Sequence, residues 1–158
     1  MKCRNCKDCT ISCAYPFHDG NNGMKNIREI AAFHITCRKC EDSPCIEVCP
    51  AKALEKNENK IIRRASNLCV ACKSCVTICP FGTLMNDFFE YCLSVCNYCN
   101  FSEETLSLEC IDTCPEKAIS LTDMEENEKE NIFALNDRIL IKDYTWEKLK
   151  HETEPLIK

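Results

Sequence analysis

Hydrophobic and polar positions form only short patterns in this chain. Residues 27–33 carry spaced isoleucine and phenylalanine residues and predict a strand. Residues 60–64 predict a second strand, which follows a polar turn at residues 57–59. Near the C-terminus, residues 138–144 alternate as a strand does, and residues 146–151 fit a helical turn. All of these predicted elements are short.

Charge and composition exclude several classes of protein. The net charge of −5 argues against nucleic acid as the main partner. The three glycines cannot form a dinucleotide or phosphate-binding loop, so we expect no bound nucleotide. No apolar run approaches the ~18 residues that span a bilayer, so we expect no direct membrane insertion. The opening residues lack the apolar stretch of a signal peptide, which predicts a cytoplasmic location.

Cysteine dominates the composition, with 17 in 158 residues. Disulfide-rich secreted proteins have a similar fraction, but here the count is odd and the cysteines come in C-x2-C groups, which suit metal better. Residues 69–80 read C-x2-C-x2-C-x3-C-P, the run that binds cubane clusters in bacterial iron–sulfur ferredoxins. In that run the first three cysteines bind one cluster and the fourth binds a different one.

Sixteen cysteines fall into four sets of this kind. The sets are Cys3, Cys6, Cys9 and Cys13; Cys37, Cys40, Cys45 and Cys49; Cys69, Cys72, Cys75 and Cys79; and Cys96, Cys99, Cys110 and Cys114. With four thiolates for each [4Fe–4S] cluster, they predict four clusters. Structural zinc also binds C-x2-C pairs, but it fits sets with an additional cysteine less well.

Three of the four sets end in a repeated segment. The segments are Cys49-Pro-Ala-Lys-Ala-Leu54, Cys79-Pro-Phe-Gly-Thr-Leu84 and Cys114-Pro-Glu-Lys-Ala-Ile119. Each predicts a ligand, a helical turn (residues 51–54 in the first) and an aliphatic residue that packs on a cluster. Lys52 and Lys117 occupy equivalent positions and are expected to be solvated. Such short repeats indicate a duplicated unit rather than a solenoid.

With these motifs the chain resembles the four-cluster ferredoxin-type subunits of multisubunit oxidoreductases. These subunits serve formate dehydrogenase, dimethyl sulfoxide reductase, hydrogenases and carbon monoxide dehydrogenase. The resemblance runs from Cys3 to about Leu121 and is most specific in residues 37–45, in residues 75–82 and in the split last set. The chain departs from the family in three ways. The strand expected before Cys3 is missing, no proline directly follows Cys13, and the tail has no match in the family. The resemblance implies an α+β fold of duplicated ferredoxin-like dicluster units, with small helices and hairpins wrapped around [4Fe–4S] clusters.

The resemblance also implies which cysteines share a cluster, because the outer sets exchange their fourth ligands and so do the inner sets. The outer clusters would bind Cys3, Cys6, Cys9 and Cys114, and Cys96, Cys99, Cys110 and Cys13. The inner clusters would bind Cys37, Cys40, Cys45 and Cys79, and Cys69, Cys72, Cys75 and Cys49. Residues 33–86 would form an inner two-cluster unit, inserted into an outer unit of residues 1–32 and 87–122. Residues 123–158 would form an acidic linker and docking tail.

Cys92 is left over and is predicted not to bind iron. With Cys96 and Cys99 it matches the C-x3-C-x-aromatic-C spacing of radical enzymes that cleave S-adenosylmethionine, but the chain is too short for their α/β barrel. We favour a buried free thiol, and a redox or partner-facing role stays open. His18 and His34 are expected to be surface or packing residues, with histidine ligation as the alternative.

Residues around the clusters are expected to influence their reduction potentials. Nearby cations such as Lys39 and Lys73 would raise the potential, and apolar burial would lower it and exclude water. The apolar residues expected in this role are Ile46, Val48, Leu54, Ile62, Val70, Ile78, Phe81 and Leu84. In the tail, Tyr144 and Trp146 either pack on the chain itself or anchor a partner.

These features predict a non-catalytic electron-transfer component. It would relay single electrons through four [4Fe–4S] clusters between a catalytic oxidoreductase subunit and a second redox partner. The catalytic subunit would be a molybdenum or tungsten enzyme, a hydrogenase or a similar protein. A freely diffusing polyferredoxin is the near alternative, and a structural or redox-sensing iron–sulfur protein is the alternative from another class.

Overall fold

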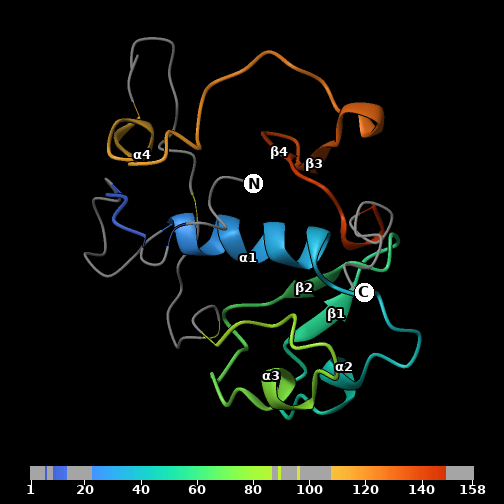
Figure 1. Ribbon diagram of the computed structural model, residues 1–158. Helices are drawn as coiled ribbons and strands as arrows, with labels where there is room; N and C mark the ends of the chain where they lie inside the picture. Colours follow the sequence, from blue (N-terminus) through green and yellow to red (C-terminus); the bar gives the residue numbers. More distant parts are fainter. Residues whose placement is uncertain are drawn as a thin grey trace, which may run out of the picture.

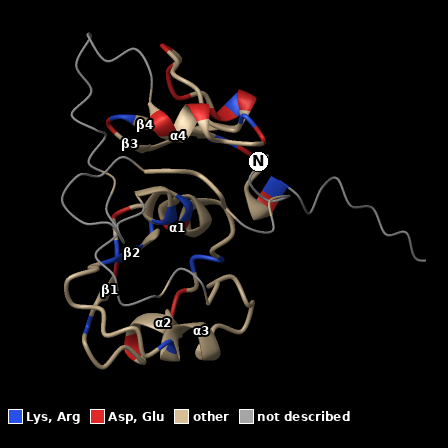
Figure 2. Ribbon diagram, turned by 90° about the vertical axis from the view of Figure 1, so that its left-hand side faces the viewer, with Lys and Arg blue, Asp and Glu red and all other residues tan. Residues whose placement is uncertain are grey.

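A helix lies across the middle of this molecule and separates two groups of short elements. The computed structural model describes residues 6, 9–13, 23–86, 89, 96 and 108–148. In the two views, the β1–β2 hairpin, α2 and α3 lie on one side of α1, and α4, β3 and β4 lie on the other (Figure 1 and Figure 2). The elements in chain order are α1 (Gly23–Ile35), α2 (Pro44–Glu47), β1 (Leu54–Lys56), β2 (Ile62–Arg64), α3 (Ser74–Ile78), α4 (Glu109–Asp112), η3 (Glu128–Glu130), β3 (Ile132–Asn136) and β4 (Ile139–Lys142). Small helices and two antiparallel hairpins confirm the predicted small α+β class. None of the described helices is long and apolar enough to cross a membrane.

The prediction of a strand at residues 27–33 is wrong, because these residues belong to α1. Seven residues are too few to separate a strand pattern from a helix pattern. Over all thirteen residues of α1, Met24, Ile27, Ala31 and Ile35 recur at the three- to four-residue spacing of one helix face. α1 therefore has a continuous apolar stripe, which the shorter window did not reveal.

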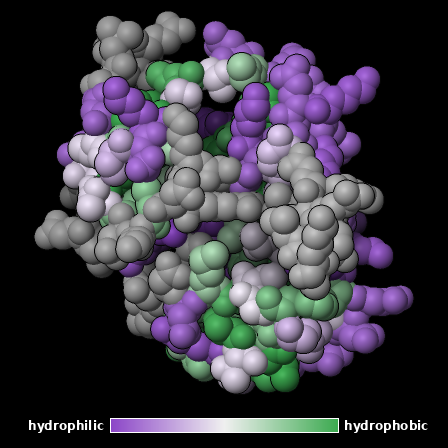
Figure 3. All heavy atoms as spheres, viewed as in Figure 1, coloured by the Kyte–Doolittle hydropathy of each residue, from purple (hydrophilic) through white to green (hydrophobic). Residues whose placement is uncertain are grey.

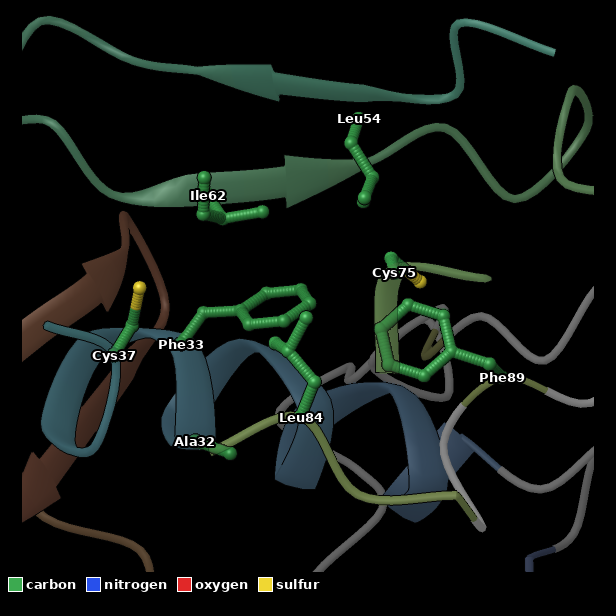
Figure 4. Packing of buried hydrophobic residues seen from close by; sticks show 8 residues of the cluster. All are labelled: Ala32, Phe33, Cys37, Leu54, Ile62, Cys75, Leu84 and Phe89. Atoms are coloured by element: carbon green, nitrogen blue, oxygen red, sulfur yellow. The ribbon is translucent and has the colours of Figure 1, made fainter. Parts of the chain in front are cut away.

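The two sides of α1 contribute to separate apolar cores. Towards the β1–β2 hairpin, Ala32 and Phe33 join a core that also contains Leu54, Ile62, Leu84 and Phe89. Figure 4 shows Leu54 and Ile62 pointing from the hairpin towards the helix, with Cys37 and Cys75 at the same interface. On the other side, Ala31 and Ile35 pack against Phe133 and Ile141 of the C-terminal hairpin. α1 thus connects the ligand loops to the tail.

The β1–β2 hairpin confirms the predicted turn and strand around residues 57–64. The register pairs Leu54 with Arg64 and Lys56 with Ile62. Asn57 closes the turn, since its N–H donates to the Ile61 carbonyl at 3.0 Å and its Oδ1 accepts from the Ile61 N–H at 2.8 Å. The amine of Lys56 donates to the carbonyls of Cys40 and, at 3.1 Å, Glu41. The hairpin therefore also supports the first ligand loop of the inner region.

The C-terminal hairpin contains one predicted strand and one that the pattern did not predict. β4 lies within the predicted residues 138–144, whereas β3 is a short strand that directly follows η3. The two strands pair antiparallel, with an irregularity between Ala134 and Asn136. The predicted helical turn is helical at residues 146–148, and residues 149–151 lie outside the described residues.

Candidate iron–sulfur sites

Four cysteines surround a cavity between the first inner ligand loop and the end of the second. Cys37, Cys40, Cys45 and Cys79 line an empty space of about 350 Å³, partly open to solvent. We call it the Cys37 cavity. Its other lining residues are largely apolar and are Arg38, Ser43, Pro44, Ile62, Pro80, Phe81, Thr83 and Leu84. Three of the cysteines come from one loop, and the fourth comes from the end of the other loop.

A second cavity has the complementary arrangement. Cys69, Cys72 and Cys75 line it together with Cys49, and its empty volume is about 330 Å³. We call it the Cys69 cavity. The third cysteine of each loop lies on a short helix, Cys45 on α2 and Cys75 on α3, and these two helices pack against each other. The structure therefore brings the eight inner cysteines together in two groups of four.

The two inner loops share an unusual backbone conformation. Lys39 and Ala71 precede the second cysteine of their loops and have φ values of 53° and 54°. Ser43 and Lys73, which precede the short helices, have φ values of 46° and 61°. Left-handed residues within a turn can direct successive N–H groups towards one concave side, which favours anions such as thiolates or an anionic cluster. The matching angles indicate that both loops are shaped for the same kind of ligand.

The Cys-Pro segments form the same turn three times. The residue three positions after the cysteine has a positive φ in each, 49° at Lys52, 59° at Gly82 and 45° at Lys117. Its N–H donates to the carbonyl of that cysteine at 3.1 to 3.2 Å. The next N–H donates to the sulfur itself in two segments, from Ala53 to Cys49 and from Ala118 to Cys114, both at 3.3 Å. The prediction of a helical turn at residues 51–54 is wrong: the turn spans residues 49–52, the left-handed Lys52 ends it, and Leu54 already belongs to β1.

Hydrogen bonds and burial act in opposite directions on the inner thiols. Burial raises the pKa of Cys75 to about 11 and also raises the pKa of Cys37 and Cys45. For Cys79, burial raises the pKa, but hydrogen bonds from Thr83 and from backbone N–H groups outweigh it and lower the pKa. Hydrogen bonds from Ser74 lower the pKa of Cys72. Metal binding at the buried thiols must therefore displace protons.

A third cavity lies at the other side of α1. Cys6, Cys9 and Cys114 line an empty space of about 350 Å³ together with Met24 and Arg28 of α1. Ile11, Met24 and Cys114 are buried beside it. These are three of the four cysteines of one predicted outer site, and the fourth, Cys3, lies outside the described residues. We call this space the Cys114 cavity.

The second predicted outer site is described only in part, since Cys99 lies outside the described residues. Cys110 lies on α4 and packs near Ile11, Met24 and Cys114, and Cys96 lies against Gly23 at the start of α1. The backbone N–H of Ser12, next to Cys13, donates to the Thr113 hydroxyl at 3.0 Å. These contacts place the three described cysteines near α1 and α4, and their common site stays a prediction. Cys92 and His18 also lie outside the described residues.

The arrangement of the thiols fits a multi-iron cluster better than a single metal ion. Within the described part of the chain, no three Cys, His, Asp or Glu side chains are placed to hold one metal ion. A tetrahedral zinc site would need its sulfurs to converge on one point. Here the four thiols of each inner group line a shared cavity instead of converging on one point. Soft thiolate donors around an apolar space are the ligands that an iron–sulfur cluster requires.

Each of the three cavities is lined by one arginine, which the sequence pattern did not predict. Arg38 lines the Cys37 cavity, Arg64 the Cys69 cavity and Arg28 the Cys114 cavity. Of the two lysines expected to lie near clusters, Lys73 lines the Cys69 cavity, and Lys39 is not among the lining residues of the Cys37 cavity. The sequence feature that could have identified Arg38 as a cavity residue is its position directly after Cys37, a predicted ligand.

Arg64 forms a buried ion pair with Glu29 of α1. Its Nη2 lies 2.7 Å from Glu29 Oε2, its Nε lies 2.9 and 3.0 Å from the two carboxylate oxygens, and each side chain is 4 % exposed. Burial lowers the pKa of Arg64, but the hydrogen bond and charge of Glu29 outweigh burial and raise it, so Arg64 stays charged. Burial raises the pKa of Glu29, and Arg64 opposes that effect. The pair attaches α1 to the wall of the Cys69 cavity.

The expectation of a fully buried apolar shell is correct only in part. Leu54, Ile62 and Leu84 are buried. Exposed instead are Val48, Val70, Ile78 and Phe81. Val48 and Ile78 lie at the ends of the short helices α2 and α3, which can bury only one side. Val70 and Phe81 lie outside the helices and line the Cys69 and Cys37 cavities, although both remain in contact with solvent.

The structure also places four of the remaining candidate residues and Tyr144 of the tail. The His34 ring lies 5.2 Å from the Phe133 ring, and burial lowers the pKa of His34. The expectation that His34 is a packing residue is confirmed. Lys52 and Lys117 are exposed, as predicted. In the tail, Tyr144 is exposed, and Trp146 stacks on Arg38 with 4.2 Å between the ring centroid and the guanidinium carbon.

Comparison with known proteins agrees with this chemistry. Residues 28–124 match the family model described as "4Fe-4S dicluster domain". The thiosulfate reductase electron transfer subunit PhsB of Salmonella typhi is 27 % identical over 146 residues, covering 80 % of this chain and 74 % of the relative. One polypeptide of the polysulfide reductase of Wolinella succinogenes is 29 % identical over 139 residues, covering 78 % and 73 %. The uncharacterized ferredoxin MJ0265 of Methanocaldococcus jannaschii is 29 % identical over 140 residues, covering 89 % and 76 %.

The family match covers more than half of the chain, including every residue of both inner cavities. The predictions of [4Fe–4S] chemistry and of a non-catalytic electron-transfer component are confirmed by this match and by the relatives named as electron transfer subunits. The chain is a member of the ferredoxin-type 4Fe–4S dicluster domain family.

Proposed function

We propose that this chain relays single electrons through four [4Fe–4S] clusters, between a catalytic oxidoreductase subunit and a second redox partner. The observation that carries the proposal is the composition of the two inner cavities, each with three cysteines of one loop and one of the other. That exchange favours two adjacent clusters rather than two unrelated metal sites. When bound, such clusters supply one-electron storage with little change in geometry.

The three cavities and the four motifs support the ligands that we assign. Cys37, Cys40, Cys45 and Cys79 hold one inner cluster, and Cys49, Cys69, Cys72 and Cys75 hold the other. In the outer pair, Cys3, Cys6, Cys9 and Cys114 hold one cluster, and Cys13, Cys96, Cys99 and Cys110 hold the other. The thiols bind the iron, the apolar walls exclude water, and N–H groups directed at sulfur stabilise the anionic charge.

A partner-binding role is supported by the exposed surface of the inner region. Val48, Ile78 and Phe81 are exposed apolar residues close to α2 and α3, and Cys72 is itself exposed. In Figure 3 hydrophobic surface gathers at this lower end, whereas hydrophilic surface covers the upper right, where Figure 1 shows β3, β4 and η3. An exposed ligand beside apolar side chains is a suitable place for a redox protein to dock.

The names of the relatives suggest the kind of catalytic partner. Two relatives are named as parts of thiosulfate and polysulfide reductases. We accordingly place this protein next to a catalytic oxidoreductase subunit, such as a molybdenum or tungsten enzyme or a hydrogenase. A relative named as a ferredoxin supports the second candidate, a freely diffusing electron carrier.

Anaerobic affinity purification of the chain from its host tests the proposal. We expect about 16 iron atoms and as many sulfides per chain, together with a stoichiometric catalytic subunit identified by mass spectrometry. Cys49→Ser should lower the iron content by up to about four atoms, whereas Cys92→Ser should leave it unchanged. A chain that purifies alone with full iron would favour the diffusing carrier. A chain with only single zinc ions would refute both functions.

A further inference from the structure

Arg38 occupies the wall of the Cys37 cavity in an unusual setting. It follows the ligand Cys37 directly, and its guanidinium carbon lies 4.2 Å from the centroid of the Trp146 ring and 5.8 Å from that of Phe81. Phe81 is itself a lining residue of the same cavity. The guanidinium is therefore held by aromatic rings at the edge of the space that four cysteines surround. Arginine is well suited to such stacking because its charged group is planar and weakly hydrated.

Among the described residues, no carboxylate balances the charge of Arg38. Within the described residues, no acidic side chain pairs with Arg38, and its Nη1 is buried without a hydrogen-bond partner. Arg64, at the Cys69 cavity, differs because Glu29 neutralises it at 2.7 Å. Arg38 therefore gives the wall of the Cys37 cavity a positive charge.

Trp146 comes from a segment that several contacts hold in place. It directly follows the buried Thr145, and the preceding β3–β4 hairpin packs on α1 through Phe133 and Ile141. The amine of Lys148 donates to Glu128 O and Asn131 Oδ1, both at 2.7 Å. This segment lies beyond residues 28–124, the part that the family model matches. The tail thus holds the ring of Trp146 against Arg38, on the wall of the Cys37 cavity.

We propose that Trp146 holds Arg38 beside the cluster bound by Cys37, Cys40, Cys45 and Cys79, and that the guanidinium thereby raises the reduction potential of this cluster. The inference rests on the proposed function, since it requires a cluster in the Cys37 cavity. Adding one electron makes the cluster more negative. A fixed positive charge on the cavity wall stabilises that reduced form more than the oxidised form. Trp146 is a positioning residue, and Arg38 is the group that acts.

The test is a redox titration of the full-length holoprotein, purified anaerobically with its bound partner and followed by electron paramagnetic resonance. Arg38→Gln should shift the midpoint potential of one cluster downwards and leave the others unchanged. Trp146→Ala should shift the same signal in the same direction by a smaller amount, and Trp146→Phe should preserve most of the wild-type value. Arg63→Gln is the matched control, because exposed Arg63 loses the same charge but lines no described cavity.

The double variant separates positioning from a direct effect of Trp146. If Trp146 acts through Arg38, then adding Trp146→Ala to Arg38→Gln produces no further shift. Unchanged midpoint potentials in Arg38→Gln would overturn the inference. So would a Trp146→Ala shift that is equally large in the wild-type and Arg38→Gln backgrounds. If Arg38→Gln lost the cluster, an unshifted signal in Trp146→Ala would still overturn it. A wild-type protein without any iron–sulfur signal would instead refute the proposed function.

Discussion

Several residues in the ligand loops adopt a backbone conformation that normally favours glycine. Lys52, Gly82 and Lys117 share it in the three Cys-Pro turns, and only one of them is glycine. A side chain in the left-handed region costs roughly 1–2 kcal/mol. Such conformations persist where the surrounding structure requires them. Here they direct the following N–H groups to the cysteine sulfurs.

Gly82→Ala should therefore destabilise the Cys37 cavity by ~1 kcal/mol, through backbone strain alone. A Cβ at this position would meet nothing within 4 Å, so no steric clash contributes. We expect loss of the visible cluster absorbance on anaerobic heating to be about fivefold faster. Lys52→Gly is the matched control and should slow the loss. A Gly82→Ala variant as stable as the wild type would show that the turn relaxes without strain.

At the scale of elements, α1 determines how the ligand loops meet. It contributes Arg28 to the Cys114 cavity and Glu29, through Arg64, to the wall of the Cys69 cavity. Its first residue, Gly23, lies against the backbone of Cys96. One helix thus contacts residues assigned to both the outer and the inner clusters.

Gly23→Ala should weaken the outer site that contains Cys96. An added Cβ would lie 2.9 Å from the Cα of Cys96 and 3.1 Å from its Cβ, so the backbone of one of them must move. Alanine favours helices, so helix propensity alone would predict a more stable protein. We expect instead a loss of up to about four iron atoms per chain, measured by iron analysis, with the inner clusters retained. Gly82→Ala, which adds the same methyl group in open space, should keep its iron when freshly purified.

At the scale of the whole molecule, the cavities take the place of an ordinary core. The inner apolar core contains Cys37 and Cys75 among its buried members and is bordered by Cys45, Cys69 and Cys79. α2 and α3 have only four and five residues, which is too short for a helix that is stable alone. The fold of residues 37–86 should therefore depend on the metal that joins its cysteines.

Removal of iron with a chelator should unfold this region first. We expect hydrogen–deuterium exchange to show a large loss of protection across residues 37–86. Protection around α1 and the C-terminal hairpin should decline less, because Ala31, Ile35, Phe133 and Ile141 form a core without cysteines. Equal protection in the iron-free and iron-loaded chains would contradict metal-dependent folding. Readdition of iron and sulfide should restore the pattern and serves as the control.

The spacing of residues along the chain is enough to predict the chemistry of this protein. Three ligands of each inner site lie within nine residues of one another, so their spacing is a local property that the chain displays directly. The same is true of the Cys-Pro turns and of the hairpin around Asn57. The fourth cysteine of each inner group comes from the other ligand loop, so local spacing does not identify it. The resemblance to known ferredoxins predicts it instead.

The residues that surround the cysteines come together through contacts between distant parts of the chain. Glu29 and Arg64 are 35 residues apart, and Trp146 reaches Arg38 from the far end of the chain. No local pattern predicts such pairs, because each depends on how α1 packs between a ligand loop and the tail. Residues 27–33 of the helix fit a strand pattern, since its apolar stripe becomes clear only over its full length. The charges on the cavity walls are therefore a consequence of packing, whereas the thiols are a consequence of spacing.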